Sequence, residues 1–237
     1  MPVERALLVI ADVGGYTRFM RLHRMSLAHS QDIIGRLLDA MIDAAPPLQL
    51  VGLEGDAAFL YLPHQPDDEA AAAQRAQAVI LAMHRAFHTQ QQWMVARNMC
   101  SCDACRQAGE LKVKFVAHVG EVASQTVRER VEVVGIDVIE THRMLKNPVP
   151  IAEYVLMSKS LYERAEWAKS EQATEIELEL EGIGPATTYF LDLGAIAPEL
   201  PTGERAGLPS RLRETMGVIA RGLPAMAGAK KRPSDAS

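Results

Sequence analysis

The sequence lacks the features that mark secreted, membrane-spanning and nucleic-acid-binding proteins. Only three of its 237 residues are cysteines, and this odd, crowded set (Cys100, Cys102 and Cys105) argues against a disulfide framework and fits a reducing compartment. No stretch approaches the roughly 20 apolar residues of a membrane span, and the first apolar run soon meets Asp12, too early for a signal peptide. A formal net charge of −5 supplies no basic field for nucleic acid. We therefore expect a cytoplasmic protein with no membrane span and no nucleic-acid partner.

Apolar residues make up 48% of the chain, enough for one substantial core. Hydrophobic periodicity predicts strands at 6–12, 48–53, 57–62, 111–124, 131–135, 153–158, 174–181 and 187–193. It predicts helices that open at 16–19 and cover 31–44, 69–92, 138–146, 159–168 and, in the tail, 210–222. Ser30 is expected to cap the second helix, and Gly120 to form a turn. This order predicts an α/β protein, an α+β sandwich with an antiparallel-dominated sheet and helices packed on it.

The same reading divides the chain into one domain and a tail. The domain covers 1–195, and a polar, cysteine-bearing insert at about 93–110 interrupts it. The extension 196–237 is rich in Pro, Gly, Ala, Lys and Arg, and we expect its end to be largely disordered.

Two aspartates follow apolar runs that read as buried strands. Asp12 stands in ALLVIADVGGYTRF, and Asp56 stands in the hairpin LVGLEGDAAFLYLP. Two carboxylates that meet at one edge of a sheet could hold divalent ions and a phosphate chain. In the alternative interpretation, each aspartate caps a helix or fills a turn.

Four segments carry a resemblance to a known family. ADVGGYTRF, EGDAAFLY, VAHVGEV and VVGIDVIETHR resemble, in the same order, the motifs of the class III adenylate and guanylate cyclase catalytic domain. The EGDA hairpin and the cysteine-rich insert are also similar to an uncharacterised bacterial cyclase-like family of the DUF2652 type. The resemblance covers about 1–195 and implies a ferredoxin-like, nucleotide-cyclase-type sheet.

This resemblance implies a role for each matching residue. Asp12 and Asp56 would hold two Mg²⁺ or Mn²⁺ ions, and Arg143 would stabilise charge on the α-phosphate of a purine nucleoside triphosphate. The nucleotide would also contact Val13, Gly14, Gly15, Tyr16, Thr17 and, at its base, Glu132. Family members work as head-to-tail dimers with shared sites, which implies a homodimer. Without the resemblance, Arg143 reads as a solvated helix residue and Glu132 as a charge on a strand face.

Two positions depart from the family pattern. Ile139 stands where the family has the asparagine that orients the ribose, and Gly52 stands where it has a base-reading lysine. Losing an orienting group can cost orders of magnitude in rate while binding persists. Two hypotheses follow: an enzyme that forms cyclic nucleotide from ATP or GTP with weak or lost activity, or a dimerising, ligand-sensing module without catalysis.

The insert and three histidines offer further candidates. MCSCDACRQAGE concentrates three soft ligands that could hold Zn²⁺, with His84, His88 or a group of another subunit as the fourth. The alternative is three reduced thiols in a loop. His84 and His88 are four apart on a predicted helix, a spacing that suits a metal or an exposed face. His118, on the His-x-Gly strand, reads more readily as a structural residue than as a general base.

Overall fold

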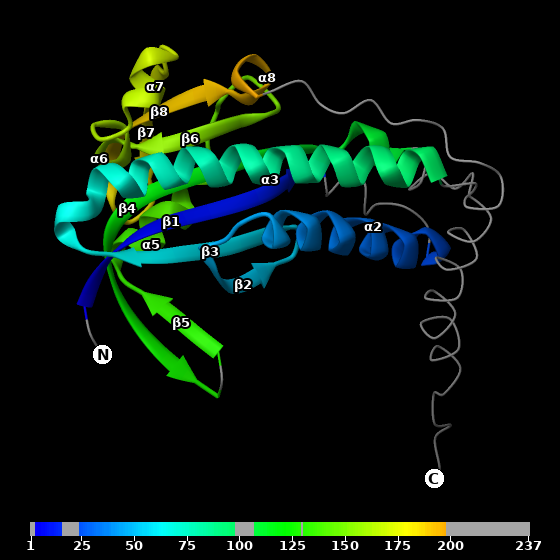
Figure 1. Ribbon diagram of the computed structural model, residues 1–237, viewed down its shortest axis with the longest axis horizontal. Helices are drawn as coiled ribbons and strands as arrows, with labels where there is room; N and C mark the ends of the chain where they lie inside the picture. The colour runs from blue at the N-terminus through cyan, green and yellow to red at the C-terminus, as the bar shows by residue number, and fades with distance from the viewer. Residues whose placement is uncertain (1–2, 16–23, 98–106, 129, 198–237) are drawn as a thin grey trace, which may run out of the picture.

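A computed structural model describes residues 3–15, 24–97, 107–128 and 130–197, and within them the chain forms one mixed sheet (Figure 1). The strand order is β2-β3-β1-β4-β6-β8-β7, with β5 paired to β4 outside this path. The β4–β6 pairing is parallel and the others are antiparallel. The strands are β1 (Val3–Gly14), β2 (Gln49–Glu54), β3 (Ala57–His64), β4 (Lys112–Val127), β5 (Arg130–Val134), β6 (Tyr154–Ser158), β7 (Thr174–Leu180) and β8 (Gly184–Asp192).

Helices cover both faces of the sheet. They are α2 (Arg24–Asp43), α3 (Glu69–Arg97), α5 (Ile136–Met144), α6 (Lys159–Tyr162), α7 (Glu166–Ser170) and α8 (Leu193–Ile196), with 3₁₀ turns η1 (Pro66–Asp68) and η2 (Ala108–Glu110). The long helices α2 and α3 contact each other and lie across the front of the sheet in Figure 1, whereas α5 lies behind it. Among the described helices, none combines the length and apolar character that crossing a membrane requires.

The central strand β1 is apolar on both sides because each of its faces is covered. Leu7 and Val9 belong to the core under α2 and α3, whereas Leu8 and Ile10 belong to the core under α5. Side chains alternate along a strand, so Asp12 lies on the α5 face, in line with Leu8 and Ile10. The strand pattern thus places this carboxylate where the apolar α5 core ends.

The predicted fold class is confirmed: an α/β architecture with a mostly antiparallel sheet and helices packed on it. The Glu54-Gly55-Asp56 hairpin and the pairing of 131–135 with the preceding strand are also as predicted. The predicted helix opening at 16–19, most of the cysteine-bearing insert and all of the extension beyond 197 lie outside the described residues.

Three local predictions were wrong. Ser30 lies inside α2 and is buried, so it is not an N-cap. The predicted helix 159–168 is two short helices, because Ala165 between them has a non-helical backbone (φ −94°, ψ 78°). Gly120 is not in a turn: β4 runs straight through it. A close contact with α5, described below, explains why this residue is glycine.

Candidate functional site

The β1–β3 pairing brings Asp12 and Asp56 together. In the register of these strands Asp12 lies opposite Ala57, the residue after Asp56. The amide of Val13 donates a hydrogen bond of 3.0 Å to the carbonyl oxygen of Asp56. The two carboxylates therefore lie at the same end of adjacent strands, although distant chain segments supply them.

The electrostatics of this pair are unfavourable for two negative charges. Burial, followed by the charge of Asp12, raises the pKa of Asp56 from 3.8 to about 6. Burial also raises the pKa of Asp12, an effect that Lys114 opposes from 3.7 Å away. Both aspartates retain some exposure to solvent. Two partly desolvated carboxylates with one nearby ammonium group form a donor set of hard oxygens that suits Mg²⁺ or Mn²⁺.

The residues that follow Asp12 lie at the same end of β1 as the carboxylate pair. Gly15, the residue after β1, has φ +89°, a left-handed conformation that glycine adopts without strain. The amide of Val13 is already used by Asp56, and its side chain is buried. Gly14 lies opposite Lys112 on β4. Tyr16 and Thr17 lie outside the described residues.

The other two predicted nucleotide residues have partners away from the carboxylates. Arg143, at the end of α5, donates a hydrogen bond of 2.7 Å to Glu181 in the β7–β8 turn. Glu132 on β5 is exposed and accepts a hydrogen bond of 3.2 Å from Gln125. Gln125 is separated from Lys114, the β4 neighbour of Asp12, by roughly 36 Å of strand. Within a single chain, Asp12 and Asp56 therefore lie together, whereas Arg143 and Glu132 bind Glu181 and Gln125 instead.

The His-x-Gly segment of β4 docks α5 onto the sheet. His118 Nε2 lies 3.2 Å from Asp137 Oδ1, and the amide of Glu121 donates to Asp137 Oδ2 at 2.5 Å. The close approach of His118 outweighs burial and lowers the pKa of Asp137. A Cβ atom on Gly120 would lie 2.4 Å from Asp137 Cγ, so only glycine allows this approach. The arrangement agrees with a structural role for His118.

Gly120→Ala is expected to lower the free energy of unfolding by about 1–3 kcal/mol, because the new methyl group overlaps the Asp137 carboxylate. Urea unfolding monitored by circular dichroism measures this change. Gly52→Ala is the control, since a Cβ there would meet no atom within 4 Å. In a double-mutant cycle, Asp137→Ala should relieve part of the cost of Gly120→Ala; strictly additive effects would contradict the explanation.

Lys114 is a site residue that sequence reasoning missed. Its side chain lies on the same face of β4 as Val116 and His118, which the alternation of LKVKFVAH could have indicated. Which strand lies beside it could not be read from that segment, because the β1–β4 register joins distant parts of the chain.

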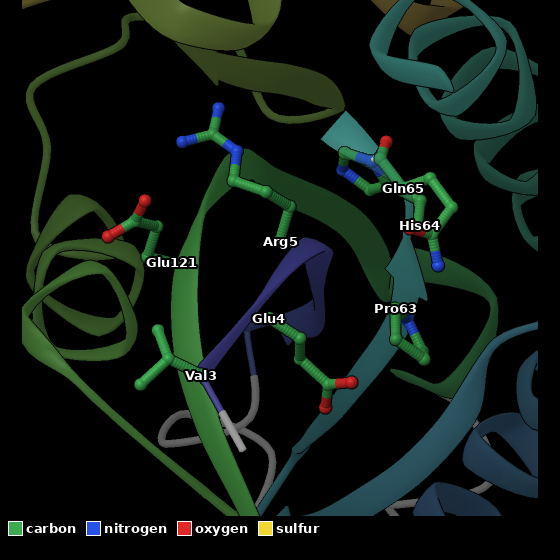
Figure 2. A pocket seen from close by; sticks show the side chains of 7 residues that line it. All are labelled: Val3, Glu4, Arg5, Pro63, His64, Gln65 and Glu121. Carbon is green, nitrogen blue, oxygen red and sulfur yellow. Dashed lines mark hydrogen bonds between the residues drawn. The ribbon is translucent and has the colours of Figure 1, made fainter. Parts of the chain in front are cut away.

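A hollow of about 600 Å³ lies at the opposite end of β1. Figure 2 shows Arg5 and Glu121 on one side of this strand and Glu4 on the other. Arg5 is engaged by Glu69, which also accepts a hydrogen bond from Arg164. The stretch of β1 from Arg5 to Asp12 spans roughly 23 Å, so this hollow is separate from the carboxylate pair. Its lining consists of Val3, Glu4, Arg5, Pro63, His64, Gln65 and Glu121.

Cys100, Cys102 and Cys105 lie in 98–106, outside the described residues. Zn²⁺ at these thiols therefore stays a prediction.

The fold is that of class III nucleotide cyclase catalytic domains. The adenylyl cyclase CyaB from P. aeruginosa matches with a TM-score of 0.60 at 15% identity, over 81% of this chain and 95% of that one. The guanylyl cyclase Cya2 matches with a TM-score of 0.58 at 16% identity, over 80% and 92%. The guanylate cyclase domain of RhGC from Catenaria anguillulae, solved in complex with GTP, gives 0.54 at 16% identity, over 80% and 97%. At these identities the likeness concerns the fold.

The chain belongs to the family described as protein of unknown function DUF2652, whose sequence profile matches residues 34–154. The uncharacterized protein Rv2561/Rv2562 of Mycobacterium tuberculosis is 37% identical over 177 residues, which cover 74% of this chain and 81% of that protein. Both sequence-based resemblances are therefore confirmed.

Proposed function

We propose that this protein binds a purine nucleoside triphosphate with Mg²⁺ or Mn²⁺ at Asp12 and Asp56, on a cyclase-type domain whose own cyclisation activity is weak or lost. The observation that carries the proposal is the meeting of these two aspartates on adjacent strands, where the charge of Asp12 helps raise the pKa of Asp56 to about 6. A bound cation would relieve this repulsion.

Each group at the edge would then have a chemical task. Asp12 and Asp56 would ligate the ions, which supply charge neutralisation at the triphosphate and a lower pKa for the ribose 3′-hydroxyl. Gly14 and Gly15 allow phosphate oxygens to approach the backbone closely. Lys114, now beside Asp12, would turn its ammonium group to the phosphate chain once the carboxylates hold cations.

A homodimer would complete the site. Arg143 is engaged with Glu181 in its own chain, but that pair is exposed and easily exchanged. Large apolar side chains are exposed on three elements that contact one another, namely β2, β5 and α5: Leu50, Leu53, Val134, Ile136 and Ile139. Such a surface favours contact with a second copy, across which Arg143 of one chain could serve the aspartates of the other.

A second candidate function, the nucleotide-sensing module without catalysis, is favoured by Ile139 and Gly52. Ile139 is 47% exposed and offers no hydrogen bond to a ribose. Gly52 on β2 has open space around it and no side chain to read a base. A domain with these residues can bind the triphosphate and its ions and still position the 3′-hydroxyl poorly.

A metal-dependent cyclisation assay with ATP and GTP separates the candidates. In wild type we expect triphosphate binding with Mn²⁺, measured by calorimetry, and little or no cyclic product. Asp12→Ala and Asp56→Ala should weaken Mn²⁺-dependent binding at least about 10-fold, because each removes a charged ligand.

Efficient product formation that both variants abolish would favour the enzyme. Equal nucleotide binding by wild type and both variants would contradict the proposal. Asp39→Ala is the matched control, since Asp39 is exposed on α2.

A further inference from the structure

A second group of potential ligands lies on the other face of the sheet. His84 and His88 stand one turn apart on α3, and Glu153 immediately precedes β6. His88 Nε2 lies 2.7 Å and His84 Nε2 3.8 Å from Glu153 Oε1. His84 is 2% exposed and His88 5% exposed, so the predicted alternative of an exposed helix face is wrong. The three side chains converge from two elements in the interior.

Gln91 fixes which nitrogen of His88 carries its proton. The side-chain amide of Gln91 donates two hydrogen bonds of 2.8 Å, to the carbonyl oxygens of Ala108 and Leu111. Its oxygen must therefore be the atom that faces His88 Nδ1 at 3.2 Å, and Nδ1 must donate. In the neutral imidazole, Nε2 then presents a lone pair to the Glu153 carboxylate. Two acceptors 2.7 Å apart need a proton or another cation between them.

His84 places unpaired ring nitrogens beside the same Glu153 carboxylate. Neither of its ring nitrogens has a hydrogen-bond partner, and both are buried. The buried position of both nitrogens disfavours an added positive charge on this ring. A buried polar group left unpaired destabilises the folded protein, which calls for a functional explanation.

We propose that His84, His88 and Glu153 bind one transition-metal ion of the Zn²⁺ type, with water as a further ligand. Two imidazoles and one carboxylate form a ligand set that Zn²⁺ accepts. The hydrogen bond from His88 Nδ1 to Gln91 orients the ring, as outer groups do at metal sites. The site differs in ligand chemistry from the hard carboxylate pair of Asp12 and Asp56.

The three side chains would need only a small movement to surround a metal ion. The candidate ligand atoms all lie within 4.8 Å of one another. Metal–ligand bonds of about 2.0–2.1 Å in a tetrahedron separate ligands by roughly 3.4 Å, between the two nitrogen–oxygen distances observed. Lys112 Nζ lies 3.3 Å from Glu153 Oε2 and opposes a cation there, but its side chain is 44% exposed and can turn to solvent.

The position of this site suggests that it fastens α3 to the sheet. Glu153 also accepts a hydrogen bond of 3.4 Å from the amide of Val113, at the start of β4. Lys112, beside Glu153, lies opposite Gly14 of β1. An ion here would therefore tie α3, β4 and β6 together close to the edge that carries Asp12.

The test uses the full chain with Cys100, Cys102 and Cys105 changed to serine, so that thiolates do not compete for the metal. Titration with Co²⁺ is expected to give one equivalent with the visible absorption of a four-coordinate site, and Zn²⁺ should displace it. His84→Leu and Glu153→Gln should each weaken Zn²⁺ affinity more than about 100-fold, and Gln91→Ala about 10- to 100-fold. The parent protein for these comparisons is the chain with the three cysteines changed to serine, and Asp56→Asn should bind Zn²⁺ as tightly as this parent.

Thermal unfolding of the parent with Zn²⁺ and with EDTA provides a second measurement that needs no substitution at the site. We expect Zn²⁺ to raise the unfolding temperature of the parent and to leave that of His84→Leu unchanged. Absence of stoichiometric Co²⁺ and Zn²⁺ binding would overturn the proposal. Binding that survives His84→Leu and Glu153→Gln, or that is lost in Asp56→Asn, would overturn it as well.

Discussion

A variant carrying Gly52→Lys and Ile139→Asn is expected to form cyclic nucleotide at least about 100-fold faster than wild type. The two substitutions restore the base-reading and ribose-orienting groups that cyclases of this fold have, by resemblance, at these positions. Both sites can accept them: a Cβ at Gly52 meets nothing within 4 Å, and about half of Ile139 is exposed to solvent. Mass spectrometry of reactions with Mn²⁺ and either ATP or GTP measures the product.

The control places the same pair of substitutions in an Asp12→Ala background. There the product should vanish, because the restored groups orient a substrate that no longer has its ions. If the double variant binds triphosphate and still forms no product, the domain is a sensor whose geometry has diverged beyond these two positions.

Asp56→Asn is expected to stabilise the protein in the absence of divalent ions. The pKa of Asp56 is about 6 in the folded protein against an ordinary 3.8, so its protonated form favours folding. This contribution is complete below pH 3.8 and is lost as the pH rises through about 6. At neutral pH the full pKa shift would correspond to a loss of about 3 kcal/mol in the free energy of unfolding. Solvent screening of the half-buried carboxylate reduces this loss to about 1 kcal/mol.

Thermal unfolding in EDTA between pH 5 and pH 8 measures this effect. The unfolding temperature of Asp56→Asn at pH 8 should exceed that of wild type by about 2–4 °C, and the difference should shrink toward pH 5. Asp39→Asn, at an exposed helix position, should show no such pH dependence. A variant less stable than wild type at pH 8 would mean that the Asp56 carboxylate is well satisfied without a cation.

The pattern of apolar residues along the strands predicted most of the fold. The apolar run around Leu8 and the hairpin at Gly55 identify β1, β2 and β3 from local sequence, and the motif order supplied their pairing. The meeting of Asp12 and Asp56 followed from that pairing. Local signals failed where a distant contact explains the residue type: Gly120 suggests a turn by its propensity, but glycine stands there because the Asp137 carboxylate leaves no room for a Cβ atom.

The remaining site residues could not be identified from one segment at a time. His84 and His88 showed helical spacing, but their ligand partner Glu153 comes from a segment that only β6 places beside α3. Lys114 lies next to Asp12 because of the β1–β4 register. The partner of Arg143, Glu181, lies at a hairpin turn that Gly182 and Gly184 indicate, but the sequence does not show that α5 ends beside this turn.

The central claim is that Asp12 and Asp56 share divalent cations with a nucleotide. Electron paramagnetic resonance of Mn²⁺, titrated with a slowly hydrolysed GTP or ATP analogue present, counts the ions bound to wild type and to Asp56→Asn. We predict up to two nucleotide-dependent Mn²⁺ ions per chain in wild type and at least about a 10-fold weaker affinity in Asp56→Asn. The same number of ions bound with the same affinity in both proteins would contradict the claim.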